Sequence, residues 1–257
     1  MISAVSIDLV YLIALGAALG FFGGLFGIGG GIIAVPVLAI GFSMSQSVAQ
    51  GTSLSMMVPI LIAGLWKYSR KHPIPLPSAI YAALIASFTT YFVAEFATGL
   101  DQTTLRTVFA VFLLALGIQM GWKTSGRFAE KSQCRISEKL MPLAGLFGGG
   151  SMGLLGVGGG LVATPILTTL FGQRQAVAQS ISMALVTPCA VVALLTYNAA
   201  DAVDWWVGLP LAIGGLVTVS KGVSLAHSLP EQKMRVLFSM MLVVTALFLL
   251  AKPYWLD

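Results

Sequence analysis

Charge is what this chain has least of. Only 9% of its 257 residues are Asp, Glu, Lys or Arg, whereas soluble domains carry roughly 25%. No charged residue occurs from Leu9 to Trp66, a run of 58 residues. One helical crossing of a bilayer takes about 20 apolar residues, so this run holds more than one crossing. The composition excludes a soluble protein and predicts an integral, multi-pass membrane protein in contact with the lipid bilayer.

The apolar stretches also lack the ten-residue alternation of membrane β-strands, so the fold class we expect is all-α. The first residues, MISAVSID, have no basic region and no small-residue cleavage site, which predicts that the first segment is retained. Tryptophans at segment ends, such as Trp66 and Trp122, fit an interfacial belt.

The chain has few cysteines, and it has no acidic residue in the middle of an apolar segment. Cys134 falls in a basic loop and Cys189 in an apolar segment, a pattern that predicts neither a disulfide nor a metal site. No Asp or Glu lies in the middle of an apolar segment, which argues against a carboxylate-based proton relay. The formal charge of +5 is typical of cytoplasmic loops, and no nucleic-acid partner is expected. We expect no cofactor and no catalytic residue.

Glycine, by contrast, is abundant, and it marks an internal duplication. GLFGIGGGIIAVPVL and GLLGVGGGLVATPIL share one pattern, and an ungapped offset of 129 places Gly27–Gly31 on Gly156–Gly160. The same offset extends through the polar residues that follow and far downstream. It pairs Pro36, Gln46, Gln50, Ser53, Pro59, Tyr68 and Arg106 with Pro165, Gln175, Gln179, Ser182, Pro188, Tyr197 and Arg235.

The duplication predicts three regions: a transmembrane repeat over residues 1–121, a cytoplasmic basic linker over 122–139, and a second transmembrane repeat over 140–257. If each repeat crosses the membrane an odd number of times, 12 of the 14 Lys and Arg residues fall on one side. The positive-inside rule favours that arrangement. It predicts two inverted-topology repeats with both termini outside the cytoplasm.

An odd number of crossings requires an unusual first segment. After the glycines only residues 31–41 remain before the polar SMSQS, enough for about half a membrane thickness. We therefore expect glycine-broken helices, discontinuous or re-entrant, that meet near the membrane midplane. Such a helix start exposes its first N–H groups and its positive dipole end, which together bind anions. Inverted-repeat transporters hold their substrates at such half-helix ends.

The candidate substrate-binding residues combine the two glycine clusters with paired neutral donors on the following segments. They are Gly29, Gly30, Gly31, Gln50 and Ser53 in the first repeat, and Gly158, Gly159, Gly160, Gln179 and Ser182 in the second. The alternative is structural: glycines let helices pack closely, and Gln and Ser join helices through hydrogen bonds.

The doubled glycine block, the VAQGTS and VAQSIS stretches, and the starts LRTVFAVFLL and MRVLFSMMLV of the last segments resemble the TauE/SafE sulfite exporter family, also called TSUP. The resemblance covers essentially the whole chain. It implies a multi-pass transporter, located in the cell (inner) membrane, of small sulfur-containing anions such as sulfite or organosulfonates. It leaves the substrate, direction and coupling ion open. An oligomer is compatible with it.

Two rival functions remain at this level. Half-helices that meet at the midplane also build anion channels. In addition, Gly149–Gly153 matches G-x-S-x-G around Ser151, and His227 lies in the same half, which raises an intramembrane serine hydrolase. The strand–turn–helix context of such a nucleophile is missing from the sequence.

Overall fold

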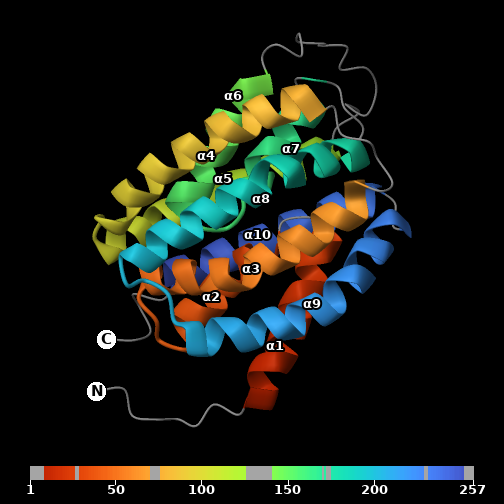
Figure 1. Cartoon of the computed structure of the whole chain (residues 1–257). Coiled ribbons are helices and arrows are strands. Elements are labelled where there is room, and N and C mark those ends of the chain that lie inside the picture. The colour runs from red at the N-terminus through yellow and green to blue at the C-terminus, as the bar shows by residue number, and fades with distance from the viewer. Residues whose placement is uncertain are drawn as a thin grey trace.

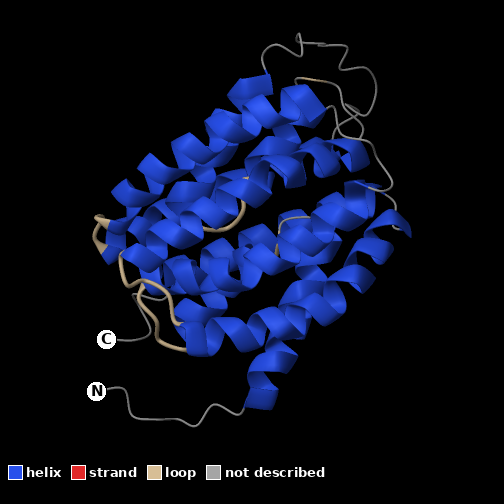
Figure 2. Ribbon diagram, viewed as in Figure 1, coloured by secondary structure: helices blue, strands red, loops and turns tan. Residues whose placement is uncertain are grey.

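The computed structural model describes residues 9–26, 29–69, 76–125, 141–169, 171, 175–228 and 231–251. Within these residues the chain is a bundle of helices without a strand (Figures 1 and 2). Six of the described helices are long and apolar enough to cross a membrane. The prediction of an all-α, multi-pass membrane protein is therefore confirmed.

The first half of the chain holds two short elements between its long helices. In order, its elements are α1 (Leu9–Phe26), α2 (Gly31–Pro36), the π-helical turn η1 (Val37–Gly41), α3 (Gln46–Ser69), α4 (Leu76–Thr98) and α5 (Gln102–Ser125).

The second half has the same succession of long and short elements. Its helices are α6 (Met141–Leu155), α7 (Gly160–Thr169), α8 (Gln175–Ala199), α9 (Trp205–Ser228) and α10 (Glu231–Ala251). The offset of 129 places α6 on α1, α8 on α3, α9 on α4 and α10 on α5.

The first long helix of each half packs against a helix of the other half. Helix α1 packs against α9, and its counterpart α6 packs against α4, the counterpart of α9. Glycines carry both contacts, because a backbone without a Cβ can approach its neighbour closely. A Cβ on Gly20 would overlap the Gly215 backbone, and at the same offset a Cβ on Gly149 would overlap the Ala86 backbone. The contacts of the two halves thus correspond residue by residue.

The same contacts fix the helix directions. Gly16 and Gly24 of α1 lie against Leu211 and Val219 of α9, so these two helices run parallel. Helix α3 also runs parallel to α9, since Gly51 meets Ala202 and Ile60 meets Gly215. Helices α3 and α8 run in opposite directions. Their contacts join Gln50 to Tyr197 and Gly64 to Met183.

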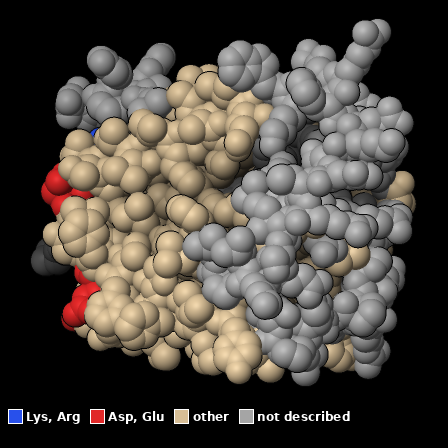
Figure 3. All heavy atoms as spheres, turned by 90° about the horizontal axis from the view of Figure 1, so that it is seen from above, with Lys and Arg blue, Asp and Glu red and all other residues tan. Residues whose placement is uncertain are grey.

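The outer surface of the described bundle is apolar, with large exposed side chains such as Phe88, Trp206, Val217 and Val244. A soluble protein would not expose so many apolar residues, whereas lipid tails solvate them. The acidic side chains visible in Figure 3 gather at one edge of the molecule. The starts of α3, α5 and α9 meet at one end of the bundle. Ser47 N–H donates to Gln102 Oε1 (3.1 Å), and Asp204 N–H donates to Thr52 Oγ1 (2.9 Å).

Candidate functional site

Both glycine clusters lie where one helix ends and a short helix begins. Helix α1 ends at Phe26 and α2 begins at Gly31, with Gly29 and Gly30 at φ 74° and 87°. Helix α6 ends at Leu155 and α7 begins at Gly160, with Gly156 and Gly158 at φ 61° and 96°. These left-handed conformations are strained for residues with a Cβ. Glycine is therefore what allows the chain to turn here.

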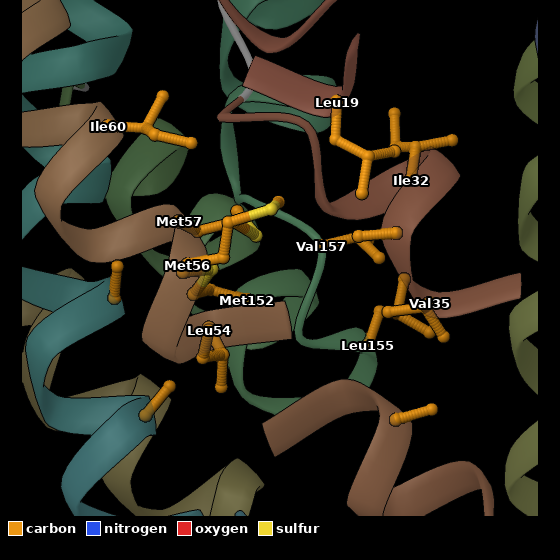
Figure 4. Close-up of a cluster of buried hydrophobic side chains, with 14 of the residues drawn as sticks. Leu19, Ile32, Val35, Leu54, Met56, Met57, Ile60, Met152, Leu155 and Val157 are labelled. Atoms are coloured by element: carbon orange, nitrogen blue, oxygen red, sulfur yellow. The ribbon is translucent and has the colours of Figure 1, made fainter. Parts of the chain in front are cut away.

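The two glycine clusters approach each other beside the middle of α3. A Cβ on Gly31 would lie 3.0 Å from Val157 Cα, so the segment before α7 contacts the start of α2. Met57, the twelfth of the 24 residues of α3, packs its side chain against Gly29 and Gly31. Figure 4 shows Val157 between Met57 and Ile32 in a cluster of buried apolar side chains.

Gln50 of α3 and Tyr197 of α8 form a fully buried polar pair. The Tyr197 hydroxyl donates to Gln50 Oε1 (2.8 Å), and it lies 3.2 Å from the Gly153 carbonyl oxygen of α6. Gln50 Nε2 is also buried and has no hydrogen-bond partner in the described part of the chain. Because the hydroxyl holds the amide oxygen, the amide N–H groups remain available for an acceptor.

Ser53 and Gly156 complete this polar cluster. The Ser53 hydroxyl lies 2.8 Å from the Gln50 carbonyl oxygen and 3.3 Å from the Gly156 carbonyl oxygen. A Cβ on Gly156 would stand only 3.0 Å from Gln50 Cβ. The candidates Gln50 and Ser53 of the first repeat are therefore positioned against the glycine break of the second.

The second-repeat candidates lie elsewhere along α8. Ser182 is fifteen residues before Tyr197, roughly 22 Å at 1.5 Å per residue, so Ser182 and Gln50 occupy different levels of the α3–α8 pair. The Ser182 hydroxyl is buried and unpartnered among the described residues. Gln179 lies on the same helix, but its side chain is outside the described ones. Gly158 and Gly159 lie between α6 and α7, and Gly160 is the first residue of α7.

One face of α3 carries a stripe that leads from its start to the glycine breaks. Gln46, Gln50, Ser53 and Met57 are spaced by three or four residues and therefore share a face. Each of the four is buried. The stripe is polar over its first two turns and apolar at Met57, where the two breaks are closest to each other.

Ser151 does not have the geometry of a hydrolase nucleophile. It lies inside α6, and its hydroxyl donates to the Gly148 carbonyl oxygen (2.9 Å) within the same helix. A nucleophile elbow instead places the serine on a sharp turn between a strand and a helix. The side chain of His227 lies outside the described ones.

Tyr197 is the contact residue that our sequence reasoning did not select. The offset pairs it with Tyr68, so the duplication itself carried a signal for this position. Tyrosine inside an apolar segment is nevertheless common at helix interfaces, and only the fold reveals that its hydroxyl reaches Gln50. Gly156 lies in the motif, but only the fold brings it to Gln50.

Comparisons with known proteins agree with the architecture. The family described as "Sulfite exporter TauE/SafE" matches residues 12–249. A protein of Methanocaldococcus jannaschii named as a probable membrane transporter is 28% identical over 93% of this chain and 94% of its own length. A probable membrane transporter of Xylella fastidiosa is 26% identical over 96% of this chain and 97% of its own. No solved structure matches the chain. The chain therefore belongs to the TauE/SafE family and is a membrane transporter.

Proposed function

We propose that this protein is a secondary transporter, acting as an exporter or permease, of small sulfur-containing anions such as sulfite or organosulfonates. The family description supports the substrate class. The substrate binds at the half-helix starts beside the two glycine breaks, where the candidate residues Gly29–Gly31 and Gly158–Gly160 present backbone N–H groups.

The unpartnered amide of Gln50 is the observation that carries this proposal. A buried polar group without a partner costs about 1–3 kcal/mol. Gln50 Nε2 is in that state beside Gly156, at the break that precedes α7. An oxyanion that accepts from Nε2 removes this cost. The backbone N–H groups at the start of α7 add neutral donors, and Ser53 adds one when its hydroxyl turns away from the Gln50 carbonyl oxygen, so no buried Lys or Arg is needed.

The two repeats have inverted topology in this proposal. Helices α3 and α8 occupy equal positions in the repeats and run antiparallel, which supports opposite insertion. Helices α1 and α3 run parallel although α2 and η1 lie between them, which supports a re-entrant segment in each repeat. Both termini then lie outside the cytoplasm, and the basic linker 122–139 lies inside.

Packing at the breaks favours a carrier over a permanently open channel. The polar stripe of α3 ends at Met57, whose side chain fills the space against Gly29 and Gly31. Fully buried Met56, Ile60 and Leu61 lie at the same level. An anion that leaves the Gln50 cluster toward the other end of the bundle must therefore displace these side chains, as alternating access requires.

Counterflow in proteoliposomes tests the proposal. Vesicles loaded with unlabelled sulfite should take up labelled sulfite faster than empty vesicles, and the effect should saturate. Gln50→Ala and Gln179→Ala should raise the half-saturating concentration. Gly41→Ala is a matched control, because a Cβ there meets nothing within 4 Å. Absence of trans-stimulation together with high flux would identify a pore, and absence of any sulfite or sulfonate flux would refute the substrate class.

A further inference from the structure

A separate cavity, with several polar side chains in its wall, lies at the end of the bundle where α3 and α5 begin. Its volume is about 310 Å³, and Ser43, Ser45, Gln46, Gln102 and Arg106 are among the residues that line it. Two hydrogen bonds join Gln102 of α5 to Ser47 of α3, one of them from Gln102 Nε2 to Ser47 Oγ (2.7 Å). These bonds hold the starts of α3 and α5 together, so the cavity lies between packed helices.

Gln46 is the buried polar group of this cavity. Only 4% of Gln46 is exposed, and neither its Nε2 nor its Oε1 has a hydrogen-bond partner among the residues that the structure describes. An amide with both ends unsatisfied is costly to bury. A ligand that accepts one hydrogen bond and brings water or a hydroxyl for the other would satisfy both ends.

Arg106 supplies a positive charge to the same cavity. Arg106 is a half-buried residue that lines the cavity, and it has no ion-pair or hydrogen-bond partner among the described residues. The nearest carboxylate along the chain is that of Asp101, five residues before Arg106, and it caps α5: Asp101 Oδ2 accepts from Thr104 N–H (2.8 Å). Hydrogen bonds from Thr104 hold the pKa of Asp101 below its ordinary value. Asp101 is thus directed to the helix start, and Arg106 is left for a ligand.

The start of α3 adds to the positive potential of the cavity. Helix α3, of 24 residues, begins at the cavity with Gln46. The start of a helix carries a partial positive charge of roughly half a unit, which stabilises an anion. The start of α5 is already capped by the Asp101 carboxylate and adds no further positive charge. The guanidinium, the start of α3 and the unpaired amide all favour the same kind of ligand.

We propose that this cavity is an outer binding site for a small oxyanion with one negative charge, of the sulfonate or hydrogensulfite type, from which the anion passes to Gln50. The transfer step rests on the proposed function. Gln46 and Gln50 lie one helical turn apart on the same face of α3, so the anion exchanges one amide donor for the next. The cavity raises the anion concentration at the start of the stripe.

The duplication provides sequence support for this role. Gln175 and Arg235 stand at the positions of Gln46 and Arg106 in the second repeat, although their side chains lie outside the described ones. A duplicated carrier would need such a site at each mouth.

A reporter cysteine tests the cavity without any need for transport. Thr103→Cys, in a background with Cys134→Ser and Cys189→Ala, places a thiol on the cavity wall. Relative to their rates with a free thiol in solution, the anionic reagent sulfonatoethyl methanethiosulfonate should react faster than its trimethylammonium analogue, and methanesulfonate should protect the thiol. Arg106→Gln should lower the anion-to-cation rate ratio by about tenfold, as expected for one charge at short range. Arg106→Lys should restore the ratio.

Two further variants separate charge from hydrogen bonding. Gln46→Leu should weaken protection by methanesulfonate severalfold and leave the rate ratio unchanged. Lys221→Gln removes an exposed cation from α9, sixteen residues after that helix begins, and should change neither quantity. An unchanged rate ratio and unchanged protection in Arg106→Gln would overturn the outer site. If these cavity results hold while wild-type protein shows no sulfite or sulfonate flux, the proposed function fails and the anion site stands.

Discussion

The Tyr197 hydroxyl of α8 donates a hydrogen bond to Gln50 Oε1 of α3 over 2.8 Å, and both side chains are fully buried. This bond joins the two repeats, because α3 and α8 occupy equal positions in the duplication. It also determines which end of the amide is engaged. The relationship couples the stability of the repeat interface to the availability of Gln50 Nε2.

Tyr197→Phe should therefore impair both folding and transport. Removal of the hydroxyl leaves Gln50 Oε1 buried and unpaired, which costs about 1–3 kcal/mol of stability. The amide is also free to turn its Nε2 away from the anion, so the half-saturating sulfite concentration should rise about fivefold or more. Thermal unfolding in detergent and counterflow kinetics measure the two effects.

A double variant separates these contributions. If Tyr197 acts through Gln50, then Tyr197→Phe should have little additional effect on sulfite affinity once Gln50→Ala is present. Full additivity of the two changes in half-saturating concentration would show that Tyr197 does not orient Gln50.

Gly156→Ala should be more damaging than an ordinary glycine replacement. Gly156 has φ 61°, where a Cβ costs about 1–2 kcal/mol. The new methyl group would also stand 3.0 Å from Gln50 Cβ and displace the amide. We expect a lower unfolding temperature and a weaker sulfite affinity. Gly99→Ala is the control, since its nearest described neighbour would be the Phe96 carbonyl oxygen at 3.5 Å. Equal effects in both variants would contradict the special position of Gly156.

The packing of α1 on α9 and of α6 on α4 predicts that glycines at corresponding positions have corresponding roles. Gly20→Leu and Gly149→Leu stand at equal positions of the two repeats and would each force a side chain into a neighbouring backbone. Both should separate their helix pairs, α1 from α9 and α6 from α4, and greatly reduce the yield of folded protein. The same substitution at the exposed Gly41 provides the comparison. The measurement is monodispersity on size-exclusion chromatography. A folded, monodisperse Gly149→Leu variant would show that the two interfaces are not equivalent.

The sequence predicted the helices well, because a long uncharged segment in a membrane protein has few alternatives to a helix. The run from Leu9 to Trp66 indicated more than one crossing, and α1 and α3 lie within it or begin in it. The offset of 129 identified which positions correspond, but it did not reveal that α1 packs on α9 of the other half. That choice depends on glycines such as Gly16 and Gly20 meeting a partner that is remote in sequence.

The candidate site was only partly accessible to sequence reasoning. Gln50 and Ser53 were selected as polar residues in an apolar segment, and their role stays a prediction. Their actual neighbours, Tyr197 and Gly156, follow from the antiparallel course of α3 and α8. Arg106 was not among the candidate residues selected from the sequence. Its place in a cavity with an unpaired Gln46 depends on how α5 begins beside α3, which no local pattern specifies.

Membrane orientation can be tested by labelling cysteines at three positions next to helix ends. The starts of α5 and α9 lie beside the start of α3, so Asp101→Cys and Asp201→Cys should emerge on one side of the membrane. Helix α3 runs away from that end, so Lys71→Cys, which follows it, should emerge on the other. In intact cells a membrane-impermeant maleimide should label the first two variants, whereas labelling of the third should require permeabilisation. The reason is that corresponding helices of inverted repeats end on opposite sides of the membrane. Labelling of Asp201→Cys and Lys71→Cys from the same side would mean parallel repeats, and the half-helix starts would then not meet at the midplane.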